Sequence, residues 1–187
     1  LENKSLRRII YLAVFTAPFT HIIMFLFQPY FIKAGVENSV WGLIMATGML
    51  FGALLMKYAY KIEKRFGTKK TIFLTTIFPG LMYLAMAFII GPILSFIWYI
   101  ILRAFSTMRD PLFSQYQNDH IHSHNRATML SVISMIVSLY LLAIRLIIGK
   151  IANSDLILSF VIMGVIIVAG AVFFRIDERH INGNHQS

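Results

Sequence analysis

The sequence predicts an all-α membrane protein with six transmembrane helices and with both ends of the chain on the cytoplasmic side. Three observations support this prediction. Of the 187 residues, 58% are hydrophobic and only 13% are charged, whereas about 25% of residues are charged in a typical soluble domain. The apolar residues fall in six blocks, each close to the roughly 20 residues that cross a bilayer. Most Lys and Arg residues lie between these blocks.

The six blocks are expected to form one helical bundle over residues 1–175, followed by a polar cytoplasmic tail over residues 176–187. The predicted spans are residues 9–31, 40–60, 71–89, 93–113, 128–148 and 156–174. The outer connections are short, as at Gly91 and Pro92 between the third and fourth spans. No internal repeat is visible in the sequence, although six spans could still be two inverted units of three helices.

Orientation follows from the positive charges, because the cytoplasmic loops of membrane proteins carry an excess of Lys and Arg. The side that includes the N-terminus has thirteen basic residues: Lys4, Arg7, Arg8, Lys57, Lys61, Lys64, Arg65, Lys69, Lys70, Arg109, Arg126, Arg175 and Arg179. The other side has two, Lys33 and Lys150. Both ends are therefore predicted to lie inside. This topology explains the net charge of +9. We therefore expect the chain to lie in a lipid bilayer and not to bind a nucleic acid.

The sequence gives no sign of a metal site, a cofactor or an enzyme active site. The chain has no Cys, which excludes disulfides and thiolate metal centres. Although His120, His122 and His124 are close together, no carboxylate set accompanies them, and we expect no metal there. A six-span serine protease would need a Gly-x-Ser-x-Gly motif, which is absent. The charged sensor helix or filter loop of a channel is absent too.

The fourth predicted span carries a polar stripe. Tyr99, Arg103, Ser106, Thr107 and Asp110 are spaced by four, three, one and three residues, which places them along one side of a helix. At the helical rise, Arg103 lies roughly 15 Å from the outer turn, near the middle of the bilayer. An Arg at this depth costs at least ~2.5 kcal/mol and usually faces a cavity or a partner. A substrate-facing stripe is one interpretation. A structural Arg bonded to carbonyl groups is the other.

Polar residues of the first span are further candidates for a binding site. His21 and Gln28 are seven residues apart and therefore share a helix face. His21 could relay protons or bind a substrate, and either residue could equally make a single interhelical hydrogen bond.

Small residues on two other spans predict helix contacts. Gly48 and Gly52 form a G-x-x-x-G motif, which allows two helices to approach closely. Ser131, Ser134 and Ser138 share a face of the fifth span, and interhelical contact is again the favoured interpretation.

The segment between the second and third spans resembles a signature of the major facilitator superfamily of transporters. That signature has an acidic residue, a basic residue, a Gly and a basic cluster between helices two and three, and in weaker form between helices eight and nine. Glu63, Arg65, Gly67, Lys69 and Lys70 match it loosely. Because the acidic residue is displaced, the match is to the weaker second copy.

A second resemblance is more specific. Residues 116–118 read Tyr-Gln-Asn, residues 126–131 read Arg-Ala-Thr-Met-Leu-Ser, and residues 149–152 read Gly-Lys-Ile-Ala. These segments are similar to motifs around helices ten and eleven of bacterial drug-efflux-like members. The resemblance covers all six spans in order, as the C-terminal half of a twelve-helix transporter. One departure is Arg145, where such proteins often have Pro. From its position near Lys150, we expect Arg145 to extend toward the outer surface.

The resemblance implies alternating access of a small-molecule substrate between two six-helix halves of the same polypeptide, in the cytoplasmic membrane. It implies that the first and fourth spans line the cavity, so that His21, Gln28, Tyr99, Arg103 and Thr107 would bind the substrate. The residues expected to control the conformation are Glu63, Arg65, Gly67, Lys69, Lys70, Asp110 and Arg126. Proton-coupled efflux is the expected activity. A sugar or organic-anion symporter half and a non-transporting six-span protein remain alternatives.

Overall fold

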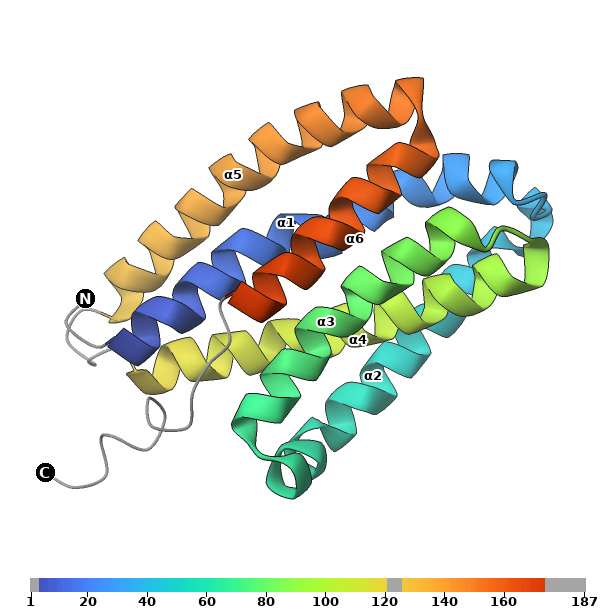
Figure 1. The fold of residues 1–187 in the computed structure, drawn as a ribbon. Coiled ribbons are helices and arrows are strands. Elements are labelled where there is room, and N and C mark those ends of the chain that lie inside the picture. Colours follow the sequence, from blue (N-terminus) through green and yellow to red (C-terminus); the bar gives the residue numbers. More distant parts are fainter. Residues whose placement is uncertain (1–3, 121–125, 174–187) are drawn as a thin grey trace, which may run out of the picture.

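The computed structural model describes residues 4–120 and 126–173, and the predicted cytoplasmic tail lies outside them (Figure 1). All regular secondary structure in the described residues is helical, and the prediction of six long helices is confirmed. The elements are α1 (Lys4–Lys33), the short 3₁₀ helix η1 (Asn38–Val40), α2 (Trp41–Phe66), α3 (Thr68–Phe88), α4 (Pro92–His120), α5 (Arg126–Ser154) and α6 (Leu156–Phe173).

Five of these helices are long and apolar enough to cross a membrane within the described residues, and α4 is the exception. Its charged residues Arg103, Arg109 and Asp110 reduce its mean hydropathy. Instead of facing outward along its length, α4 packs against α1, α2 and α3. A helix enclosed by three others does not need an apolar surface on every side, because its polar residues can avoid contact with lipid.

The connection between α2 and α3 differs from the prediction. We expected about ten residues of loop between spans ending at 60 and beginning at 71, but both helices continue through this segment and only Gly67 is non-helical. Gly67 has φ 80° and ψ 154°, in the positive-φ region that a side chain disfavours. Its N–H donates to the Glu63 carbonyl at 2.7 Å, and its own carbonyl accepts from the Thr71 N–H at 3.1 Å.

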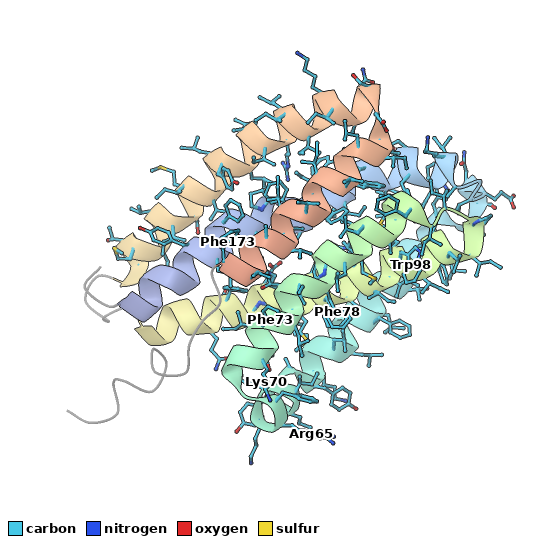
Figure 2. All side chains as sticks on the ribbon, in the orientation of Figure 1. Arg65, Lys70, Phe73, Phe78, Trp98 and Phe173 are labelled. Atoms are coloured by element: carbon cyan, nitrogen blue, oxygen red, sulfur yellow. The ribbon has the colours of Figure 1, made fainter. Side chains whose placement is uncertain are left out.

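The helices alternate in direction, so that the connections gather at two ends of the bundle (Figure 1). The α1–α2, α3–α4 and α5–α6 connections lie at one end. The α2–α3 turn, the beginning of α1 and the end of α4 lie at the other. Arg65 and Lys70 mark the α2–α3 turn in Figure 2, and this is the end predicted to be cytoplasmic.

The central pair is α1 and α4, which contact each other and most of the remaining helices. On one side of this pair, α3 and α6 pack closely together. Gly80 of α3 and Gly164 of α6 make this possible, because a Cβ at Gly164 would lie 2.7 Å from Leu84 Cγ and 2.9 Å from the Gly80 carbonyl oxygen. Tyr83 of α3 then donates from its hydroxyl to the Phe19 carbonyl of α1 at 2.6 Å.

The two flanking helices meet the central pair separately, α2 against α4 and α5 against α1. The prediction for the G-x-x-x-G motif of α2 is confirmed. A Cβ at Gly48 would lie 3.3 Å from Arg103 Cβ, and a Cβ at Gly52 would lie 2.8 Å from Thr107 Cβ. The prediction for the serines of α5 is wrong, because Ser131, Ser134 and Ser138 are all exposed.

Candidate functional site

One side of α1 is left uncovered by the other helices. The side chain of His21 is 37% exposed, Met24 is 42% exposed, and Gln28 is exposed. These residues occupy positions i, i+3 and i+7, so that they form a continuous strip. The opposite side of α1, which includes Phe19 and Ile23, is fully buried against the rest of the bundle. The prediction that His21 and Gln28 share a face is therefore confirmed.

The polar stripe of α4 divides between two environments. Arg103 and Thr107 are half-buried and Asp110 is exposed, whereas Ser106 is buried. Tyr99 is 1% exposed, because its ring packs against two rings of α1, with the centroid of Phe31 5.2 Å away. The structure thus places Tyr99 in an aromatic core, packs Thr107 against Gly52 of α2, and leaves Arg103 and Asp110 nearer the uncovered side.

The uncovered sides of α1 and α4 meet at His21 and Asp110. His21 Nε2 lies 3.8 Å from Asp110 Oδ2. Both side chains lean toward the N-terminus of their own helix, as helical side chains do. Because α1 and α4 run in opposite directions, this brings the two groups toward each other. Nothing in the sequence indicated that these two residues would meet, because they are far apart along the chain.

We name this uncovered surface the open face. It consists of His21, Met24 and Gln28 of α1, Arg103 and Asp110 of α4, and Arg145 of α5.

We expected Arg145 to extend toward the outer surface, but it does not. Its guanidinium carbon lies 4.2 Å from the centroid of the Phe25 ring on α1, and its Nε atom is buried. Arg145 belongs to α5, which runs toward the outer side, and a helical side chain leans back toward the start of its helix. The cation therefore remains within the bundle and stabilises the contact between α5 and α1 by a cation–π interaction.

A second arginine of α4, Arg109, is buried and does not lie at the surface where we predicted it. We counted Arg109 among the cytoplasmic surface charges, but it is 2% exposed. It donates from Nη2 to Thr16 Oγ1 on α1, and its Nη1 lies 3.9 Å from Asp110 Oδ1. Its guanidinium also lies 4.5 Å from the Phe113 ring centroid. A signal was present in the sequence, because Arg109 shares a helix side with the buried Leu102.

The open face is positively charged. Arg103, Arg109 and Arg145 are all close enough for their charges to act on His21, and Asp110 acts on it with the opposite sign. His21 is thus the point at which the charges of α1, α4 and α5 converge. Within the open face itself, Arg103 and Arg145 against the single carboxylate of Asp110 leave an excess of positive charge when the imidazole is neutral.

The residues expected to control the conformation lie away from the open face, except Asp110. Arg65 and Lys70 are exposed at the α2–α3 turn, while Glu63 is half-buried there. Figure 2 shows Arg65 and Lys70 extending from the end of the bundle. The side chains of Lys69 and Arg126 lie outside the described residues.

Comparisons with protein families, curated proteins and solved structures return no match for this chain.

Proposed function

We propose that this chain is one half of a secondary transporter, which moves a small organic solute across the cytoplasmic membrane by alternating access. In this proposal all six helices cross the membrane, both ends lie inside, and a second six-helix half follows the same plan in the same polypeptide. The chain is not an enzyme. Proton-coupled export is the expected direction, as in the drug-efflux-like members of the major facilitator superfamily.

The observation that supports the proposal best is the open face. Polar side chains of the two central helices are left uncovered on one side, although each is surrounded by apolar sequence. His21, Gln28, Arg103 and Asp110 would be unfavourable against lipid, by about 2.5 kcal/mol or more for a central charge. They would be stable if they lined a water-filled cavity between two halves.

The pairing of the helices gives independent support. The extensive contacts are α1 with α4, α5 and α6, α3 with α4 and α6, α2 with α3 and α4, and α5 with α6. Exchanging α1 with α4, α2 with α5 and α3 with α6 converts this set into itself. Neighbouring helices alternate in direction, and each unit has three helices. The second unit therefore begins in the opposite direction and must be inverted relative to the first. Inverted units of this kind are a common design of secondary transporters, with the substrate at the repeat interface.

Cysteine labelling in membranes tests the cavity, since the chain has no Cys of its own. Met24→Cys places a thiol on the open face. Leu146→Cys is the control, because Leu146 is 70% exposed. It lies two positions before the buried Ile148, which puts it on the side of α5 that faces away from the bundle. Met24 and Leu146 both lie roughly 12 to 14 Å from the outer ends of their helices.

We expect a water-soluble maleimide to modify Met24→Cys at least about tenfold faster than Leu146→Cys, because only thiolates that reach water react readily. Equal, slow modification of the two thiols would mean that both face lipid, and the chain would then be a non-transporting membrane protein. Reduced labelling of Met24→Cys after addition of a transported solute would identify that solute directly.

A further inference from the structure

We propose that the open face binds an organic anion, with a carboxylate, sulfonate or phosphate group held between Arg103 and Arg145. This inference rests on the proposed function, since it names the class of solute that the same face would take.

The two arginines differ from Arg109 in having no polar partner. Neither Arg103 nor Arg145 makes a hydrogen bond or an ion pair with another residue that the structure describes, whereas Arg109 contacts Thr16 and Asp110. The single carboxylate of the open face is already within 4 Å of His21 and of Arg109. Two guanidinium groups are therefore left without a counter-charge among the residues that the structure describes.

Both arginines lie at a similar depth. Arg103 is 11 positions from the first residue of α4, and Arg145 is nine positions from the last residue of α5. At 1.5 Å per residue these separations correspond to about 16 and 14 Å from the same end of the bundle. A hydrocarbon core is about 30 Å thick. Both charges also act on His21, so one anionic group beside His21, near the middle of the membrane, could compensate both.

The geometry of Arg145 suits anion binding. Its guanidinium carbon lies 4.2 Å from the centroid of the Phe25 ring, a cation–π contact that holds the side chain in place. Its Nε is buried, so the terminal Nη groups are the ones that would donate to a solute. Those groups bind carboxylate, sulfonate or phosphate oxygens in the plane of the guanidinium. Arg103 is fixed differently, because the start of its side chain packs against Gly48 of α2. Met24 and Phe25 offer apolar surface for the remainder of the solute.

The same charges disfavour a cationic solute. A cation on the open face would meet Arg103 and Arg145 without gaining Asp110, whose carboxylate faces His21 and Arg109. Like charges brought together at low dielectric repel strongly. The expected selectivity is therefore for anions over cations of the same size and shape.

Two probes that differ in charge but share a ring test this selectivity. Naphthalene-2-sulfonate and trimethyl(naphthalen-2-yl)ammonium would be equilibrated by dialysis with the native full-length polypeptide in lipid nanodiscs, with empty nanodiscs as the blank. We expect the anion to be retained at least about tenfold more tightly than the cation, equivalent to about 1.4 kcal/mol.

Four variants connect this binding to the arginines. Arg103→Gln and Arg145→Gln should each weaken anion binding by about tenfold, as loss of a charged hydrogen bond does. Lys150→Gln, at the exposed end of α5, is the control and should change nothing. Asp110→Asn should tighten anion binding by about two- to fivefold through removal of the nearest negative charge. Misfolding cannot produce that gain.

Equal retention of the two probes, or anion binding that survives both arginine substitutions, would overturn the inference. The outcomes also separate this inference from the proposed function. Transport of cationic solutes with no anion binding would leave a transporter with a different substrate. Anion binding with the expected variant pattern, but with no accumulation in proteoliposomes under any ion gradient, would retain the site and remove the transport function.

Discussion

The two sides of the central helix pair are built on opposite principles. On the side of α3 and α6, glycines allow backbones to approach closely, and Tyr83 donates to a carbonyl group of α1. On the open face, Arg103 and Arg145 make no hydrogen bond with a described residue, and side chains such as Met24 and Gln28 are exposed. The comparison shows that α1 and α4 are closely packed on one side and leave polar side chains exposed on the other.

The largest expected effect on stability is at the α3–α6 contact. Gly164→Ala would place a methyl group 2.9 Å from the backbone oxygen of Gly80, and the two helices would have to separate. We expect a loss of about 3 kcal/mol in the free energy of unfolding, at the upper end for overpacking. Gly42→Ala is the control, since nothing lies within 4 Å of a Cβ there. Denaturation in mixed micelles measures both variants, and equal stabilities would contradict the close contact.

An intermediate effect is expected from one substitution made at two arginines of α4. Lys keeps the charge but loses the planar, forked donor geometry. Arg109→Lys would break the contact with Thr16 in a site that is 2% exposed, at a cost of about 2 kcal/mol. Arg103→Lys should change the free energy of unfolding by less than about 0.5 kcal/mol. If the order were reversed, Arg103 would be the structural arginine and the open face would lose its main binding group.

The smallest effect should come from single hydroxyl groups. Tyr83→Phe removes the 2.6 Å hydrogen bond to Phe19 and should cost about 1 kcal/mol. Tyr99→Phe should be nearly neutral, because Tyr99 contributes ring contacts with Phe27 and Phe31 and its hydroxyl has no hydrogen bond among the described residues. Thermal unfolding of both variants would show whether hydrogen bonds stabilise only the side of the central pair that packs against α3 and α6.

Hydropathy was enough to predict six helices, since long apolar blocks leave few alternatives. It could not predict which helices touch, because every apolar surface looks alike in sequence. The predicted spans were too short at the α2–α3 connection, where α2 ends at Phe66 and not at 60, and α3 begins at Thr68 and not at 71. Lys61, Lys64 and Lys70 suggested a loop, yet helices continue to both sides of Gly67. Beyond the apolar core, charged residues on the solvated last turns do not prevent helix formation.

The arrangement of the candidate residues on their helices was predicted in part. Helical spacing correctly grouped His21 with Gln28, and it identified Arg103 and Asp110 as residues near one side of α4. Spacing within a helix cannot show which neighbour a residue meets. It therefore missed the approach of His21 to Asp110 and the burial of Arg109, which both depend on the contact between α1 and α4.

The one-residue connection at Gly67 has a mechanical consequence. With a single non-helical residue between them, α2 and α3 share only two adjustable backbone angles at their joint. Only these two angles can absorb a tilt of α2, so much of the movement is expected to pass to α3. The movement of α3 would then displace α6, because the close packing at Gly164 prevents these two helices from sliding past each other. Any opening or closing of the bundle beside α2 is therefore expected to displace the three helices as one lever arm.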